Sequence, residues 1–197
     1  YRQSSRFDAQ AAAIDADNRL LWRMSPRRLD AENLRDAVLV AAGELNTEMA
    51  GPGYRDFETF VRNSQFYEIV DPDAAEFYRR TIYRTWIRSG RSPLLDVFDC
   101  PDPSTKTPVR AVTVTPLQAL SLMNNSFMLR MAERLAERLQ QEAGGDVRAQ
   151  VLRAIDISYG RKATDDEVER YSSFIESYGL AEFCRVLFNS NEFLVVD

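Results

Sequence analysis

Three aspartates, Asp96, Asp99 and Asp102, recur every third residue in the segment DVFDCPD. A helical turn would place the first two on one face, and the proline turn that follows would curl the third toward them. Converging carboxylates supply oxygen ligands for a hard cation such as calcium, or a general acid and base for glycoside chemistry. The segment lacks the spacing and glycine of a calcium loop, and aspartates beside prolines are ordinary turn formers. We therefore favour a structural turn, with ligand binding and catalysis as alternatives.

Two arginines near this segment are further candidates for binding. A concave pocket that gathers Arg84 and Arg110 with the aspartates would indicate a functional site, because charged groups that converge in a cleft are typical of such sites. The alternative, which we favour, is that these arginines pair with nearby carboxylates or lie in solvent.

Asparagines and aromatic residues offer two more candidate surfaces. Asn124 and Asn125 either present their side-chain amides to a ligand or satisfy backbone groups at a break in a helix, and the second interpretation is favoured. A group of aromatic side chains predicts either a sugar-stacking platform or, in the favoured interpretation, a core beneath a small sheet. Its members are Tyr54, Phe57, Phe60, Phe66, Tyr67, Tyr78, Tyr83 and Trp86.

The chain contains no histidine. This excludes Ser-His-Asp and Cys-His nucleophiles, His-ligated zinc and the Cys-x-x-Cys-His haem attachment signature. Glycine-rich phosphate loops and G-x-S-x-G elbows are also missing. We expect no cofactor or metal in this domain, and we expect Cys100 and Cys184 to be free thiols, with a disulfide between them as the alternative.

The composition of the chain limits the classes of protein to which it can belong. The 197 residues are 45% hydrophobic and 28% charged, which is typical of an ordinary globular domain. A net charge of -5 argues against nucleic-acid binding, and no apolar run approaches the roughly 20 residues that span a bilayer. The first residues, YRQSSR, have no initiator methionine and no signal sequence, so we expect a chain cut from a longer protein.

The first part of the chain predicts an arm followed by a helix. Residues 1–24 predict a short helix or extended arm and a turn, after which Leu20, Leu21 and Trp22 pack on the core. Ser25 precedes a proline, and a side-chain acceptor before a proline is typical of a helix start. We therefore expect a helix from the proline at position 26 to about residue 42.

The second half is predicted to be helical. Thr115 and Pro116 repeat the same start signal before a long apolar pattern, which the segment Asn124-Asn125-Ser126 divides into two helices or bends. Thr164 and Glu167 form a capping box, and amphipathic spacing continues from there toward the C-terminus.

These elements together predict a mainly α protein. Residues 57–70 and 77–87 are rich in β-branched and aromatic residues, so we expect an irregular multi-helix domain with a small β hairpin-like insertion around residues 57–88. We expect one helical domain over residues 1–197, the C-terminal domain of a longer protein, with an irregular insertion and central loop at 44–115.

Five segments carry a resemblance to a known family: YRQSSR, IDADNRLLWRM, RRTIYRTWIRSGRSPLLDVFDCPDPST, TVTPLQALSLMNNSFMLRMAERL and CRVLFNSNEFLVVD. They resemble the planctomycete-specific C-terminal domain of unknown function, which closes large proteins that also carry a planctomycete cytochrome c domain. The resemblance implies an exported, periplasmic or cell-envelope location. Many relatives carry a histidine where this chain has Phe7, so the resemblance brings no histidine chemistry here.

The function that follows from these observations is a non-catalytic structural or protein-interaction module of a large exported cytochrome-associated protein. Its expected partners are other domains of the parent protein or a protein of the cell envelope, with a glycan as an alternative. The rival hypothesis is a carbohydrate-binding or polysaccharide-acting domain that uses Asp96, Asp99 and nearby aromatics. An enzyme is the less favoured class.

Overall fold

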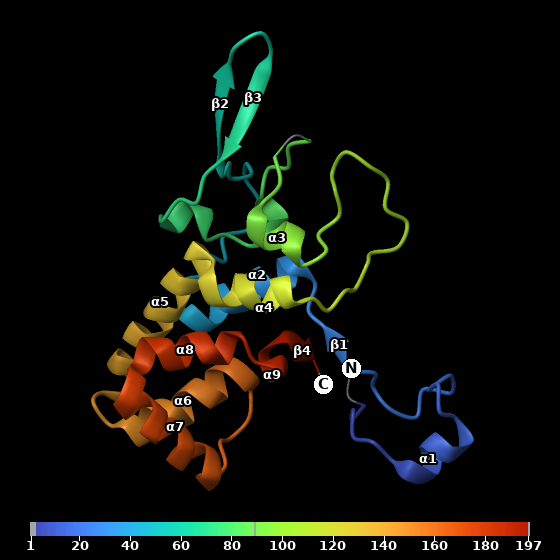
Figure 1. Ribbon diagram of the computed structural model, residues 1–197, viewed down its shortest axis with the longest axis vertical. Helices are drawn as coiled ribbons and strands as arrows, with labels where there is room; N and C mark the ends of the chain where they lie inside the picture. Colours follow the sequence, from blue (N-terminus) through green and yellow to red (C-terminus); the bar gives the residue numbers. More distant parts are fainter. Residues whose placement is uncertain (1–2, 89, 197) are drawn as a thin grey trace.

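A helical body carries a projecting β hairpin and an N-terminal arm (Figure 1). The structure is a computed structural model that describes residues 3–88 and 90–196. Its helices are α1 (Ala9–Ile14), α2 (Ala31–Ala42), α3 (Pro93–Val97), α4 (Pro116–Asn124), α5 (Ser126–Ala143), α6 (Val147–Tyr159), α7 (Asp165–Tyr178), α8 (Leu180–Phe188) and α9 (Asn191–Leu194). Its strands are β1 (Arg27–Arg28), β2 (Phe57–Val61), β3 (Gln65–Ile69) and β4 (Val195–Val196). The prediction of a mainly α fold with a small hairpin is confirmed.

Helix α5 lies at the centre of the core. Its apolar residues recur every fourth position, so they form one face. Met131, Leu135 and Leu139 on this face are fully buried, and they pack with α2 and α8. Burying each such side chain contributes roughly 1.5–3 kcal/mol, so this face contributes substantially to the stability of the body.

Asn125 separates α4 from α5. Its backbone is extended, with φ -67° and ψ 133°, so the long apolar pattern forms two helices rather than one bent helix. The Asn125 side chain accepts a hydrogen bond from the backbone N–H of Phe127 and caps α5. Thr115 forms the expected capping box with Gln118 at the start of α4, and Thr164 forms one with Glu167 at the start of α7.

The predicted helix start at Pro26 is wrong. Helix α2 begins at Ala31, and the two arginines after the proline form β1, which pairs antiparallel with β4 at the other end of the chain. The backbone N–H of Leu29 donates to the carbonyl oxygen of Leu194 at 2.8 Å and continues this pairing. Sheet hydrogen bonds from a distant segment thus outweigh the local start signal.

The N-terminal arm does not pack as expected. Leu20 and Leu21 are 79% and 69% exposed, so the prediction that they reach the core is wrong. The Asp15 carboxylate accepts hydrogen bonds from the backbone of Arg19 and Leu20, and this turn directs the leucines into solvent. Trp22 packs edge-on against a phenylalanine within the arm, with ring centroids 6.0 Å apart.

The second predicted strand, over residues 77–87, does not form. Short 3₁₀ helices form instead, at Ala75–Phe77 and Thr81–Tyr83. Two charged side chains of α2 hold them: Arg35 donates to the carbonyl oxygen of Phe77 at 2.6 Å, and Asp36 accepts from the backbone N–H of Thr81 at 2.8 Å. These side chains satisfy some backbone groups of the segment, and Tyr54 satisfies others through backbone hydrogen bonds with Tyr83 and Thr85.

No helix in the part of the chain that the structure describes is long and apolar enough to cross a membrane.

Candidate functional site

The three aspartates of DVFDCPD do not share one site. Asp96 and Asp102 both bind Arg91, which lies in solvent with 52% of its side chain exposed. Asp99 binds a different arginine, Arg28, at 2.6 Å. The structure therefore brings two of the carboxylates together around a cation of the chain itself and directs the third elsewhere.

Asp99 stabilises the loop that precedes α4 through hydrogen bonds with Thr113. Its backbone has φ 62°, a conformation that aspartate tolerates better than most residues, and this reverses the chain. Its carboxylate accepts hydrogen bonds from the backbone N–H and the hydroxyl of Thr113 at 2.9 and 2.8 Å. Burial opposes ionisation, but the bonds from Thr113 and from Arg28 outweigh it and hold the pKa of Asp99 below its usual range.

Arg110 forms a bidentate ion pair with Glu32 of α2, with both N–O distances at 2.7 Å. The thiol of Cys100 lies 3.8 Å from the same carboxylate, and burial together with this negative charge raises the pKa of the thiol to about 12. Burial also raises the pKa of Cys184 to about 12. Both cysteines are free, as expected, and both are poor nucleophiles near neutral pH.

Arg84 is buried at the base of the hairpin. It is 3% exposed, and its Nε donates to Oδ2 of Asp56 at 2.7 Å. Its guanidinium also lies 4.8 Å from the ring centre of Trp86. Four buried polar atoms in this neighbourhood lack a hydrogen-bond partner among the described residues: Nη1 and Nη2 of Arg84, Oδ1 of Asp56 and the hydroxyl of Tyr54. Each such atom costs about 1–3 kcal/mol, so this is the least satisfied polar region of the site.

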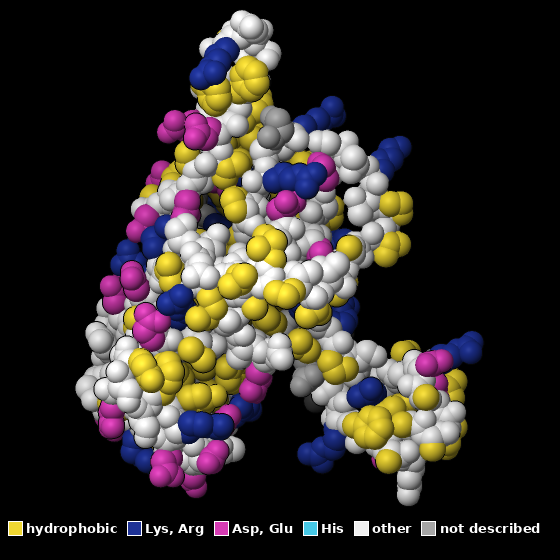
Figure 2. All heavy atoms as spheres, in the orientation of Figure 1, with side chains coloured by type: hydrophobic (Ala, Val, Ile, Leu, Met, Phe, Trp, Pro, Cys, Tyr) yellow, Lys and Arg dark blue, Asp and Glu magenta, His cyan; other side chains and the backbone are white. Residues whose placement is uncertain are grey.

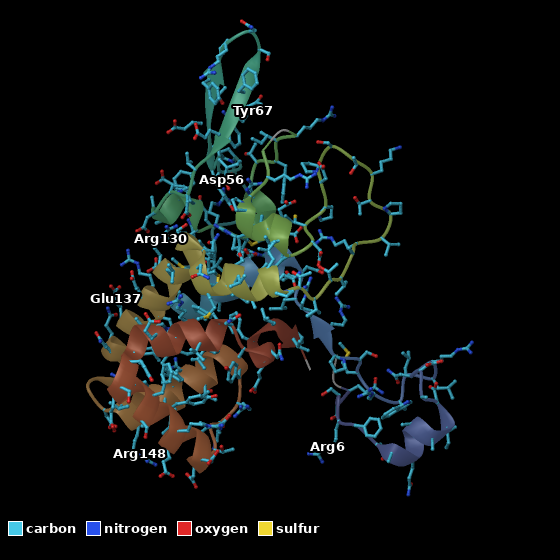
Figure 3. The ribbon with its side chains drawn as sticks, viewed as in Figure 1. Arg6, Asp56, Tyr67, Arg130, Glu137 and Arg148 are labelled. Carbon is cyan, nitrogen blue, oxygen red and sulfur yellow. The ribbon has the colours of Figure 1, made fainter. Side chains whose placement is uncertain are left out.

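A cavity of about 150 Å³ adjoins this cluster. Tyr54 and Asp56 line it from the segment before β2, and Arg35 lines it from α2. Asn125 and Ser126 line it from the junction of α4 and α5. Figure 3 shows Asp56 where the hairpin meets the helical body.

Each carboxylate that lines the cavity forms an ion pair with an arginine side chain. Asp71 at its rim binds Arg130 and Ser126, with distances of 2.5 Å to each. Burial opposes ionisation of Asp71, but these two partners outweigh it and lower the pKa of the carboxyl. With Asp56 held by Arg84 as well, the carboxylates of the cavity already have arginine partners.

Asn125 is the predicted site residue that lines this cavity. Its neighbour Asn124 donates from its side-chain amide to the carbonyl oxygen of Leu120 at 2.8 Å. Both asparagines thus satisfy helix backbone groups, the role that we favoured. Sequence reasoning missed Asp56 as a site residue, because an aspartate just before a strand is an ordinary turn residue.

The hairpin above the cavity has two unlike faces. Phe57, Tyr67 and Ile69 lie half-buried on one face, and a Cβ added at Gly90 would lie 2.9 Å from Ile69, so the chain at Gly90 covers this face. The other face is open. Phe60 and Phe66 stack there with ring centroids 5.6 Å apart, and they are 39% and 45% exposed.

Two glutamates lie beside the stacked rings on the open face. The strand register places Glu58 directly opposite Glu68, and both side chains are exposed. Figure 2 shows hydrophobic side chains near the end of the hairpin, with a basic group and an acidic group next to them.

Comparison with known proteins identifies a family but no curated or structural relative. The family model described as PSD1, a protein of unknown function (DUF1553), matches residues 1–175. No curated protein and no solved structure matches the chain. Because the match covers most of the 197 residues, the chain belongs to the PSD1 family of proteins of unknown function (DUF1553).

Proposed function

We propose that this chain is a non-catalytic protein-interaction module and that the β2–β3 hairpin contacts its partner. The observation that carries this proposal is the open face of the hairpin, where Phe60 and Phe66 are 39% and 45% exposed on a ribbon that projects from the body (Figure 1). A two-stranded hairpin is marginally stable alone, and exposed rings on it gain free energy when a partner covers them.

The state of the aspartates supports a structural role over a catalytic one. A general acid needs a proton near the working pH, whereas Arg28 and Thr113 keep Asp99 ionised. Asp96 and Asp102 share Arg91, which neutralises part of their charge. These contacts explain the carboxylates as groups that hold loops in place, and the two that converge are bound to Arg91 rather than free to act as an acid and a base.

The proposed setting is a large exported, cytochrome-associated protein, periplasmic or in the cell envelope. This part of the proposal is supported by the resemblance of the quoted segments to the planctomycete C-terminal domain. The partner of the hairpin is then another domain of the parent protein or a second protein of the envelope.

Site-specific photocrosslinking tests the proposal. A photoreactive phenylalanine analogue replaces Phe66 on the open face of the hairpin, or Tyr178 of α7, which is 68% exposed and serves as the control. We expect position 66, in the parent protein and in its native cells, to crosslink to one protein or one segment of the parent that mass spectrometry identifies. Position 178 is expected to give no such product.

Two outcomes would contradict the proposal. One is equal crosslinking at the two positions, or none at position 66. The other is turnover of a defined substrate that Asp96→Asn or Asp99→Asn abolishes, since this would show that the domain is catalytic.

A further inference from the structure

The open face of the hairpin combines two negative charges with two aromatic rings. Alternate residues of a strand share a face, so Glu58 and Phe60 of β2 lie on the same side as Glu68 and Phe66 of β3. We call this surface, made of Glu58, Phe60, Phe66 and Glu68, the acidic-aromatic face.

Its glutamates repel each other. They are directly opposite in the strand register, where like charges destabilise a pair of strands. Among the residues that the structure describes, no arginine or lysine forms an ion pair with either carboxylate. A positive charge from outside would remove this repulsion and gain attraction at both carboxylates.

The aromatic half of the surface also suits a cation. The guanidinium carbon of Arg62, in the turn of the same hairpin, lies 5.8 Å from the ring centre of Phe60. This distance is within the roughly 6 Å over which a cation is attracted to an aromatic face. The ring is thus already in contact with a guanidinium group, and the paired Phe66 ring extends the surface.

The third carboxylate on this side of the ribbon already has a partner, whereas Arg62 beside Phe60 carries a positive charge of its own. Asp56 precedes Glu58 by two residues, and Arg84 binds its carboxylate at 2.7 Å. The opposite side of the ribbon is covered at its base by the chain at Gly90, which contacts Ile69. The uncompensated charge therefore lies on the open side, beside the exposed rings.

We infer that the acidic-aromatic face receives a basic segment of a protein partner, with arginine or lysine side chains between Glu58 and Glu68 and over the phenylalanine rings. This inference rests on the proposed function and adds the chemistry of the partner. A guanidinium group fits both halves, since it bonds to carboxylates and stacks on aromatic rings.

Binding of a fluorescent hexa-arginine peptide to the full chain, measured by anisotropy at several salt concentrations, tests the chemistry. The variant Glu58→Gln/Glu68→Gln is expected to bind about tenfold more weakly, because two exposed ion pairs are lost. The matched control, Glu169→Gln/Glu176→Gln, removes the same charge from two exposed positions of α7 and is expected to stay within about twofold of the unaltered chain.

The aromatic half is tested in the same way. Phe60→Ser/Phe66→Ser is expected to weaken binding at high salt, where charge attraction is screened. A hexa-glutamate peptide is expected not to bind. Circular dichroism of each variant checks the fold, and the glutamine variant is expected to remain folded because it relieves repulsion.

Equal weakening by the two glutamine pairs would overturn the inference, since it would show diffuse attraction to an acidic protein. The native partner gives a second test. If the partner that crosslinks at position 66 binds the Glu58→Gln/Glu68→Gln chain unchanged, the inference fails while the proposed function stands. If no partner crosslinks there, the proposed function fails with it.

Discussion

Arginine side chains hold the irregular parts of this molecule together. Arg79 is 7% exposed and donates to the carbonyl oxygens of Pro52, Ala50 and Glu48 at 2.6, 2.5 and 3.2 Å. A planar guanidinium has five donors in a fixed fork, so one side chain satisfies several backbone groups that lack a helix or sheet partner. Arg84 and Arg110, the two arginines that the sequence offered as ligand groups, likewise have structural partners in Asp56 and Glu32.

The buried pair of Arg84 and Asp56 predicts an asymmetric response to mutation. Asp56→Ala leaves a buried guanidinium without its counter-charge, which we expect to cost about 3–5 kcal/mol of unfolding free energy. Arg84→Met should cost less, because the Asp56 side chain is 16% exposed against 1% for Arg84, so water reaches a carboxylate left alone more easily than a guanidinium left alone. Urea unfolding followed by circular dichroism measures both changes.

A control for this prediction is Asp96→Ala, which removes a carboxylate with 43% of its side chain exposed. Its expected cost is within about 1 kcal/mol. Equal destabilisation by Asp56→Ala and Asp96→Ala would show that burial of the Arg84 pair does not carry the stability assigned to it.

At the scale of elements, Arg161 joins the end of α6 to α7 and α9. It binds Glu167 of α7 at 2.6 Å and Glu192 of α9 at 2.5 Å. The hydrogen bond from Arg161, with others from Thr164, lowers the pKa of Glu167 to about 2. The capping box of α7 and this ion pair thus use the same carboxylate, so the helix start and the packing of the three helices depend on each other.

This shift predicts acid sensitivity of the C-terminal helices. The pKa of Glu167 is lower in the folded protein than the ordinary value of 4.5, so its contribution to stability is present above pH 4.5 and is lost as the pH falls toward 2. In Arg161→Met we expect lower stability near neutral pH and a flatter dependence on pH between 4.5 and 2. Unfolding free energies measured across this range test it.

The matched control is Arg170→Met, which removes an exposed pair with Asp166 on the same helix. It should leave the pH dependence unchanged, because exposed pairs contribute little. The role assigned to Arg161 would be wrong if the unfolding free energies of the two variants changed with pH by the same amount between pH 4.5 and 2.

At the scale of the whole molecule, the arm and the body are unequal in stability. Every buried residue of the core cluster lies at or beyond Ala31, and the arm is attached through β1. Contacts of the arm are largely its own, such as the hydrogen bond from the backbone N–H of Met24 to the carbonyl oxygen of Ser4 at 3.0 Å. Few buried contacts therefore tie it to the helices.

Removal of residues 1–24 is expected to change the unfolding free energy by less than about 1 kcal/mol, since no buried core residue is lost. Removal of residues 191–197 should cost several times more, because it deletes the buried Phe193 and the strand that pairs with β1. Urea unfolding of both truncated chains measures this difference. A larger loss from the first truncation would show that the arm supports the core.

Sequence alone determined the helical class, the starts of α4 and α7, and the buried face of α5. Thr115 and Thr164 bond to groups three residues away, so their local sequence decides their role. Apolar spacing likewise needs no knowledge of the partner helix. The same start signal at Ser25 failed because β4, at the far end of the chain, supplied competing hydrogen bonds.

The tertiary structure decided which charged side chains meet. Asp96 and Asp99 are three residues apart, yet one binds Arg91 and the other binds Arg28. A positive φ at Asp99 turns its carboxylate toward a segment 71 residues away. Composition and spacing identify which residues carry charge, but only the path of the folded chain sets their partners, because those partners come from distant parts of the sequence.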